Sequence, residues 1–281
     1  MNNKAIGVFD SGIGGLTVYK ALKEILPEEK VVYLGDTARL PYGTKSAETI
    51  IHFSEDNARF LLTKDIKIIV VACNSASSHA LRHLQHTFSE LPVLGVIEPG
   101  AEAAVESSRA TIGVIGTSAT IMSGAYERAI LERKPDARII AKDCPLFVPL
   151  VEEGWAKHRV TQLVAEEYLL PLKEKGIDSL VLGCTHYPVL KGVFAHVLGE
   201  NIQLIDSAET TARKVFAVLN TSGWLSRVDN GREDEFYVTD FPDRFKKVGE
   251  IFLERKIEKV TTVDVCTIAV TGQAATKRHK I

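Results

Sequence analysis

The sequence lacks several features that mark common classes of protein. It has no excess of basic residues, because 34 lysines and arginines are set against 36 aspartates and glutamates, giving a net charge of −2. A chain without basic excess does not match a phosphate backbone, so we expect no nucleic acid partner. No apolar run reaches roughly 18 residues, and the first one ends at Asp10, which predicts neither a membrane span nor a signal peptide. We therefore expect a cytoplasmic protein with no membrane partner.

Cysteine is scarce, and its spacing excludes two kinds of site. The chain has four cysteines, at positions 73, 144, 184 and 266, and none lies near another in sequence. This spacing excludes a zinc knuckle and does not favour a disulfide framework. A phosphate loop, a His-Glu-x-x-His motif and a serine-hydrolase elbow are also missing, so we expect neither metal nor cofactor. An isolated cysteine is ordinarily a small buried apolar residue, and this is our interpretation of Cys266.

Short apolar runs alternate with amphipathic stretches, which predicts an α/β fold with parallel strands covered on both faces. The predicted strands are 5–10, 30–36, 67–74, 92–97, 111–116, 137–142, 179–184 and 202–206. Helical patterns include 46–64, 76–89, 119–133, 159–175 and 208–220. A strand at 235–240, a helix near 242–255 and a strand at 257–265 are predicted after them.

The chain also repeats weakly. "AIGVFDSG" (5–12) resembles "TIGVIGTS" (111–118), "VVACNSAS" (70–77) resembles "LVLGCTHY" (180–187), and 93–104 resembles 202–212. Since the three offsets are nearly equal, we predict two similar, doubly wound parallel-sheet lobes related by a pseudo-two-fold, with the active site in the cleft between them. The first lobe comprises 1–98 plus 207–265, the second comprises 99–206, and 266–281 form a loose tail.

Cys73 and Cys184 occupy matching places in the two repeats, each at the end of a strand and before a helix. Ligands bind at that edge of an α/β sheet, so two facing lobes would aim both thiols at one ligand. The helix dipole would also lower the pKa of such a thiol. The alternative is that both cysteines only close buried strands.

Other predicted strand ends carry neutral hydrogen-bond donors, which suit small carboxylates better than a nucleotide. The alternatives are a tight turn at 9–15, a packed tyrosine at 40–46 and plain N-caps at 116–124. The candidate binding residues are Ser11, Pro41, Tyr42, Gly43, Asn74, Ser75, Thr117, Thr120 and Thr185.

Two acid–base candidates accompany the thiols. Asp10 belongs to the lobe of Cys73, and His186 lies two residues after Cys184, so each could exchange a proton with its thiol. A structural role for His186 is the alternative. Glu152 and Glu153 end an apolar run, and Glu152 is a candidate for binding an ammonium group unless both are solvated charges. Two opposed thiols suit the inversion of a carbon that bears one acidic hydrogen.

Several segments resemble the cofactor-independent glutamate racemases of the aspartate/glutamate racemase superfamily. They are "IGVFDSGIGGLTV" (6–18), "YLGDTARLPYG" (33–43), "VVACNSAS" (70–77), "VIGTSATI" (114–121), "CPLFVPLVEEG" (144–154), "LVLGCTHYP" (180–188), "LIDSAE" (204–209) and "FYVTDFPDRF" (236–245). The resemblance implies two-thiol racemisation without pyridoxal phosphate or metal. It also implies a supply of D-glutamate for peptidoglycan, and a homodimer.

The resemblance also assigns roles to residues. It places the catalytic thiols at Cys73 and Cys184, and we predict Asp10 and His186 as the catalytic acid–base groups beside them. Its substrate-binding positions are Asp10, Ser11, Tyr42, Gly43, Asn74, Ser75, Thr185 and His186, with Thr117, Thr120 and Glu152 nearby. We add Pro41, from the same turn as Tyr42, to the predicted substrate-binding residues. Ser75 stands where the family usually has threonine, and His186 stands where aspartate racemases tend to have glutamate, which favours glutamate as the substrate.

Two alternatives remain open at this point. The first is an aspartate or broad-specificity amino-acid racemase. The second belongs to another class of protein, a non-catalytic two-lobe amino-acid binding module or a thiol redox sensor. The acid–base neighbours of the cysteines argue against a plain binding module, and the absence of a close cysteine pair argues against a redox sensor.

Overall fold

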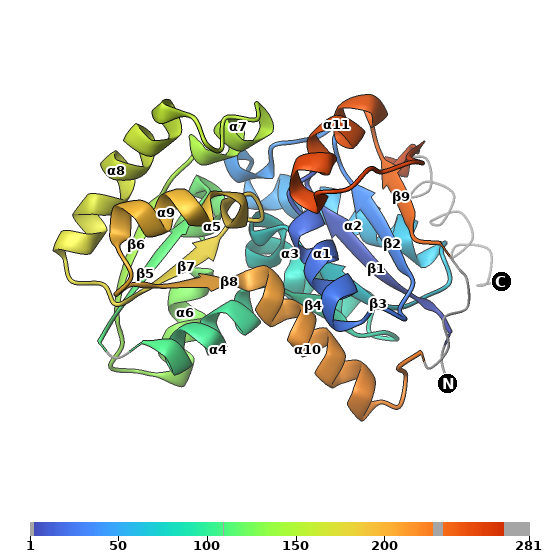
Figure 1. Cartoon of the computed structure of the whole chain (residues 1–281). Helices are drawn as coiled ribbons and strands as arrows, with labels where there is room; N and C mark the ends of the chain where they lie inside the picture. Colours follow the sequence, from blue (N-terminus) through green and yellow to red (C-terminus); the bar gives the residue numbers. More distant parts are fainter. Residues whose placement is uncertain (1–2, 109, 227–232, 267–281) are drawn as a thin grey trace.

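The computed structural model describes residues 3–108, 110–226 and 233–266, which build two separate parallel sheets (Figure 1). The first sheet has the order β10 (Thr261–Thr262), β9 (Glu235–Val238), β2 (Val31–Gly35), β1 (Ala5–Asp10), β3 (Ile66–Val71) and β4 (Val93–Gly95). The second has the order β6 (Arg138–Asp143), β5 (Thr111–Gly116), β7 (Ser179–Gly183) and β8 (Gln203–Asp206).

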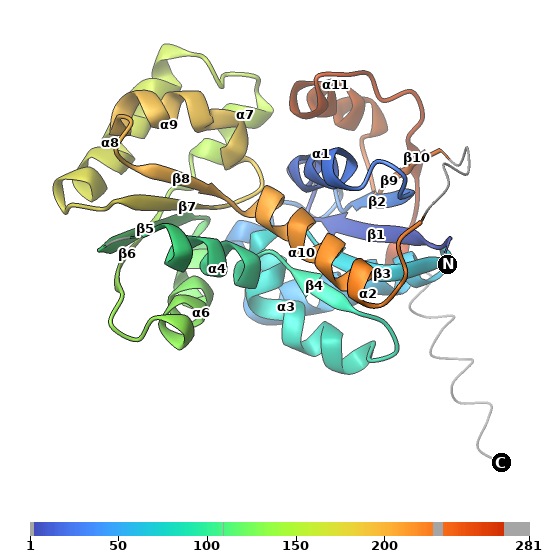
Figure 2. The ribbon, with the colours of Figure 1, turned by 60° about the horizontal axis from the view of Figure 1, so that its bottom comes forward.

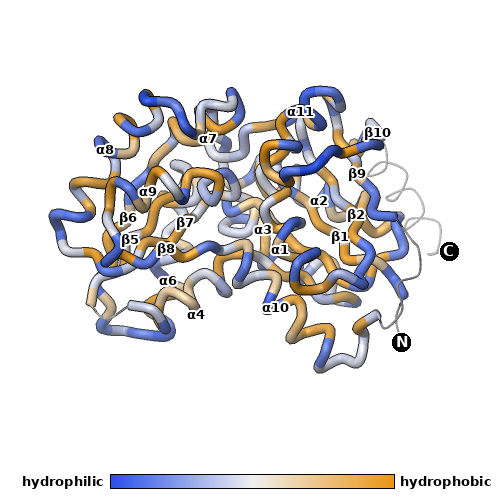
Figure 3. The backbone as a smooth tube through the Cα atoms, viewed as in Figure 1, coloured by the Kyte–Doolittle hydropathy of each residue, from blue (hydrophilic) through white to orange (hydrophobic). Residues whose placement is uncertain are grey.

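The central strands form because they are continuous apolar runs that can be buried on both faces. Every residue of β1, β3, β5 and β7 is buried, whereas the edge strands β6 and β8 are partly exposed. The hydropathy of the chain follows this arrangement, with hydrophobic segments inside each lobe and hydrophilic ones around it (Figure 3). Strands buried on both faces need helices above and below them.

Helices cover both faces of each sheet (Figure 2). Those around the first sheet are α1 (Leu16–Ile25), α2 (Ala47–Leu62), α3 (Asn74–Thr87) and α11 (Pro242–Leu253). Those around the second are α4 (Ile97–Ser107), α5 (Ser118–Met122), α6 (Ala125–Arg133), α7 (Phe147–Glu152), α8 (Arg159–Glu174) and α9 (Lys191–Leu198). The helix α10 (Ser207–Thr221) follows β8 and packs against both α1 and α4, so it joins the two halves.

The two sheets share one strand order. Strands β2-β1-β3-β4 of the first sheet correspond to β6-β5-β7-β8 of the second, and all their pairings are parallel. The predicted fold class of two similar α/β lobes is therefore confirmed. Strand β9 pairs with β2, so the segment after α10 adds to the sheet that carries the N-terminal strands.

Four details differ from the predictions. The expected helix 119–133 is broken at Gly124, whose φ of +63° separates α5 from α6. The expected strand 257–265 shrinks to Thr261–Thr262. Cys184 is followed by the 3₁₀ turn η2 (Tyr187–Leu190) rather than directly by an α-helix. Cys266 is exposed rather than buried, because it follows the last strand at the surface.

The expected tail, 266–281, lies outside the described residues apart from Cys266. Among the residues that the structure does describe, no helix combines the length and the apolar character needed to cross a bilayer.

Candidate active site

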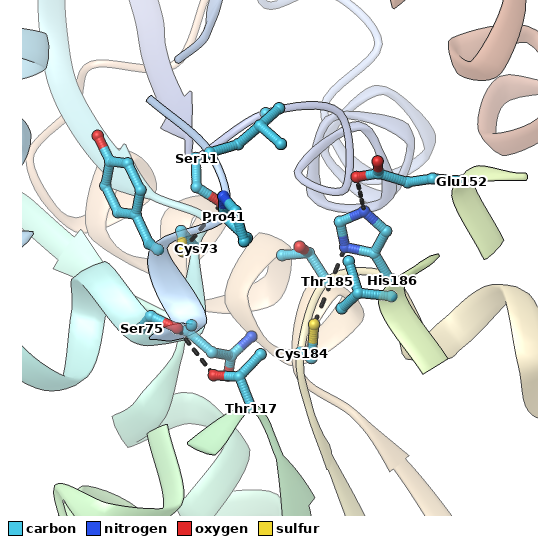
Figure 4. Close-up of a pocket in the computed structure, with 15 residues that line it drawn as sticks. Ser11, Pro41, Cys73, Ser75, Thr117, Glu152, Cys184, Thr185 and His186 are labelled. Carbon is cyan, nitrogen blue, oxygen red and sulfur yellow. Dashed lines mark hydrogen bonds and ion pairs between the residues drawn. The ribbon is translucent and has the colours of Figure 1, made fainter. Parts of the chain in front are cut away.

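The carboxyl edges of the two sheets meet at a narrow cavity of about 30 Å³. Its lining comes from both lobes and includes both thiols (Figure 4). The lining residues are Ser11, Gly12, Leu40, Pro41, Tyr42, Gly43, Cys73, Asn74, Ser75, Thr117, Val148, Glu152, Cys184, Thr185 and His186.

Cys73 lies at the N-terminus of α3, at the end of the central strand β3. Its Sγ donates to Ser11 Oγ at 3.5 Å, and the residue is only 5% exposed. Burial raises the pKa of Cys73 to about 12, and the nearby carboxylate of Asp10 acts in the same direction. The prediction that the pKa of such a thiol is lowered is therefore wrong for Cys73, because desolvation by burial raises it. Cys73 carries its proton at neutral pH.

Cys184 faces a histidine rather than a hydroxyl. Its Sγ lies 3.9 Å from Nδ1 of His186, and Nε2 of the same ring lies 3.0 Å from Oε1 of Glu152. Burial alone would lower the pKa of His186, but the hydrogen bonds and charges of Cys184 and Glu152 raise it to about 10. The ring is thus an imidazolium at neutral pH, placed to exchange a proton with Cys184.

Glu152 holds that imidazolium in place. Burial alone would raise the pKa of Glu152, but His186 and then Arg244 of α11 lower it, so the carboxylate stays ionised. Nη2 of Arg244 lies 3.5 Å from Oε2 of Glu152 and 3.2 Å from Oε1 of Glu153. Glu152 is therefore occupied by His186 and Arg244, which leaves it less suited to the ammonium group expected from the sequence.

Three hydroxyl groups from the two lobes form one cluster. Ser75 Oγ lies 2.9 Å from Thr117 Oγ1 and 3.3 Å from Thr120 Oγ1, and the two threonines are 3.1 Å apart. Thr117 is also the N-cap of α5, so the same residue can both cap the helix and line the cavity. Ser75 and Thr117 face the cavity, and Thr120 supports them from behind.

The turn 40–44 carries Tyr42 and Gly43 to the cavity. The hydroxyl of Tyr42 donates to the buried carboxylate of Asp36 and accepts from Asn57 Nδ2 at 3.0 Å. Tyr42 is therefore a packed tyrosine, as the alternative interpretation of this turn predicted, and it also lines the cavity. A Cβ on Gly43 would lie 2.7 Å from Cβ of Thr117 in the other lobe, so glycine is required for the lobes to meet here.

Asp10 lies beneath the cavity and does not line it. It is fully buried, and its carboxylate accepts from the Gly12 N–H at 2.9 Å and from Thr185 Oγ1 at 3.4 Å. Burial raises the pKa of Asp10, although His186 and these hydrogen bonds oppose the shift. Asp10 therefore reaches across to the Cys184 side as well as sharing the lobe of Cys73.

The structure brings most of the predicted site residues to one cavity. Asp10 and Thr120 stand one layer behind it, while the roles assigned to all of them stay predictions. Three lining residues went unselected in the sequence, namely Gly12, Leu40 and Val148. Gly12 and Leu40 lie inside the two turns already singled out, but nothing in the sequence distinguishes Val148 from a core residue. Within 3–108, 110–226 and 233–266, no group of three or more His, Cys, Asp or Glu residues could hold a metal ion.

Comparison with known proteins agrees with this arrangement. Residues 6–215 match the Asp/Glu/hydantoin racemase family. The chain belongs to that family. Glutamate racemase of Geobacter metallireducens is 50% identical over 263 residues, which cover 93% of this chain and 97% of that protein. The resemblance seen in the sequence motifs is confirmed.

Solved structures of this racemase family are also similar. The structure of Francisella tularensis glutamate racemase in complex with D-glutamate has a TM-score of 0.89 and 40% identity, covering 95% of this chain and all of that one. Glutamate racemase from Thermus thermophilus, in complex with β-chloro-D-alanine, has a TM-score of 0.84 and 47% identity, covering 94% and 98% of the two chains.

Proposed function

We propose that this family member interconverts L- and D-glutamate, using Cys73 and Cys184 as two opposed acid–base groups. The observation that carries the proposal is that one cavity is lined by a thiol from each lobe. The relatives support glutamate as the substrate, since those at 40–50% identity bear the name glutamate racemase. The role of the product would be to supply D-glutamate for peptidoglycan.

Racemisation needs one group to remove the α-proton and another to deliver a proton to the opposite face. The protonated state of Cys73 fits one direction of this reaction. Cys73, whose pKa is raised to about 12, carries the proton to be delivered. We assign removal of the proton from L-glutamate to Cys184, because the imidazolium of His186, whose Nδ1 lies 3.9 Å from Sγ, would stabilise a negative charge on the sulfur. The roles reverse for D-glutamate.

The cavity offers donors for the carboxylates of the substrate. The hydroxyl groups of Ser11, Ser75, Thr117 and Thr185 line it, together with the side chain of Asn74. Nδ2 of Asn74 is buried without a hydrogen-bond partner, so it is available to a ligand. Asp10 accepts hydrogen bonds from Gly12 and Thr185 and interacts electrostatically with His186. Because both acid–base groups belong to the chain, we expect the reaction to need no cofactor.

The wider organisation is also proposed. We assign 1–98 plus 207–265 to the lobe of Cys73 and 99–206 to the lobe of Cys184. We further propose a homodimer in the cytoplasm, where reducing conditions keep thiols free.

The test is a circular-dichroism time course with L-glutamate and protein free of added cofactor. We expect the signal to decay to zero as the racemic mixture forms. An unchanged signal would refute the racemase and favour a binding module.

L-aspartate is the matched substrate control, because its side chain is one methylene shorter and would displace the α-carbon from the thiols. A displacement of about 1 Å can cost on the order of a hundredfold in rate. Equal kcat/KM values for the two substrates would instead favour a broad-specificity racemase.

A further inference from the structure

Tyr126 joins the two lobes beside the thiols, although it does not line the cavity. It lies in α6 of the Cys184 lobe, is 2% exposed, and donates from its hydroxyl to Oδ1 of Asn74 at 2.7 Å. Asn74 belongs to the other lobe, follows Cys73 directly and begins α3. This hydrogen bond therefore connects the second lobe to the residue next to a catalytic thiol.

The oxygen and the nitrogen of the Asn74 side-chain amide differ in their hydrogen bonding. Its oxygen is bound by Tyr126, whereas Nδ2 is buried without a hydrogen-bond partner. Since Asn74 lines the cavity, its NH₂ group is the end left for a ligand. An NH₂ group donates to a carboxylate, while a flipped amide would offer an acceptor in the same place. The orientation of this one side chain decides which chemical group is recognised.

Two glycines leave room for the ring of Tyr126. A Cβ on Gly100 of α4 would lie 3.1 Å from Cε1 of the ring, and a Cβ on Gly183 would lie 3.0 Å from Cε2. Gly183 ends β7 and directly precedes Cys184. Tyr126 thus packs against the backbone below one thiol and bonds to the neighbour of the other. Burial raises the pKa of Tyr126, so its hydroxyl remains a donor at neutral pH.

We propose that Tyr126 is a positioning residue that holds the NH₂ group of Asn74 toward the cavity, where it binds a carboxylate of the substrate. The proposal rests on the racemase activity proposed above and adds a residue that acts on the substrate through Asn74; its hydroxyl also hydrogen-bonds with Ser207, which does not line the cavity. Tyr126 packs against Gly183, the residue before Cys184, and hydrogen-bonds to Asn74. The NH₂ group of Asn74 is therefore oriented only when the two lobes are correctly placed.

The test compares Tyr126→Phe, Asn74→Ala and the double variant in both reaction directions. We expect Tyr126→Phe to raise KM for both enantiomers by roughly five- to tenfold, the effect of losing one neutral hydrogen bond, with kcat changed less than twofold. In the Asn74→Ala background, Tyr126→Phe should raise KM much less, because the hydrogen bond to Asn74 is already gone and only the hydrogen bond between the Tyr126 hydroxyl and Ser207 is lost. An unchanged KM, or equal losses in both backgrounds, would overturn the proposal.

Two further variants keep the test decisive. Tyr19→Phe is the matched control, because Tyr19 is buried and its hydroxyl bonds to Asp234, away from the cavity; we expect its kinetics to equal those of the wild type. If Tyr126→Phe does not fold, Asn74→Asp keeps an acceptor for Tyr126 and removes the NH₂ group. A wild-type KM in Asn74→Asp would overturn the proposal. Wild-type protein without racemase activity would refute the proposed function itself, a result distinct from all of these.

Discussion

The carboxylate of Glu152 holds His186 against the second thiol, with Oε1 of Glu152 3.0 Å from Nε2 of the ring. The opposite ring nitrogen, Nδ1, lies 3.9 Å from Sγ of Cys184. The first thiol, Cys73, has a hydroxyl partner instead, Ser11. The two lobes are therefore similar in backbone but unequal in charge, and this inequality has measurable consequences.

Protein stability should reveal the protonated state of His186. Its pKa is about 10 in the folded protein against an ordinary value of 6.5, so the folded chain keeps a proton that the unfolded chain releases. The resulting stabilisation is fully present below pH 6.5 and is lost as the pH rises through 10, at a slope of at most about 1.4 kcal/mol per pH unit. The difference in free energy of unfolding between wild type and His186→Gln should therefore shrink steadily over this range.

Urea denaturation at several pH values between 6 and 10 measures that difference. His196→Gln is the control for replacing a histidine at the surface, because His196 is exposed on α9. A constant difference for His186→Gln would show that its ring is not held as an imidazolium.

Gly14 allows the lobes to meet behind the cavity. A Cβ at this position would lie 2.3 Å from Oγ1 of Thr185 and 2.5 Å from Nδ1 of His186. We expect Gly14→Ala to displace these groups and to lower kcat/KM by about a hundredfold or more.

The matched control for Gly14→Ala is Gly192→Ala, within α9, where an added Cβ would have no atom within 4 Å apart from its chain neighbours and the backbone of its own helix. It should leave activity unchanged and stabilise the fold by up to about 1 kcal/mol, because alanine favours a helix. Near-normal kinetics in Gly14→Ala would contradict the close lobe contact.

Loss of either lining thiol should abolish catalysis. Cys73→Ser and Cys184→Ser each place a much weaker acid at one face of the substrate, so we expect racemisation to fall by at least roughly a thousandfold. Cys144→Ser makes the same change at a buried cysteine that does not line the cavity, and it should retain activity within about twofold. Kinetic assays of the three variants decide between these outcomes.

The sequence predicted the part of this structure that follows from local patterns. Buried parallel strands such as β1 and β5 are continuous runs of apolar residues, and the repeat of Cys73 at Cys184 identified matching strand ends. Because parallel strands present their carboxyl ends at one edge, residues distant in the chain could be placed in one site.

Other features depend on contacts that no local pattern contains. The pairing of Glu152 with His186 requires the packing of α7 against the turn after Cys184, and the bond from Tyr126 to Asn74 requires both lobes. The raised pKa of Cys73 depends on its burial, which outweighs the helix dipole expected from its position. The prediction that Cys266 is buried was wrong, because its exposure depends on the path of the chain after β10.

The most direct test of the two-thiol account follows the α-hydrogen of L-glutamate in D₂O. Cys73, whose exchangeable proton is then deuterium, should deliver deuterium to the face opposite that from which Cys184 removes hydrogen. NMR or mass spectrometry during the first turnovers should find D-glutamate fully deuterated at the α-carbon, while the remaining L-glutamate keeps its hydrogen. Deuterium entering unreacted L-glutamate as fast as product forms, or hydrogen retained in the product, would contradict two separate and opposed bases.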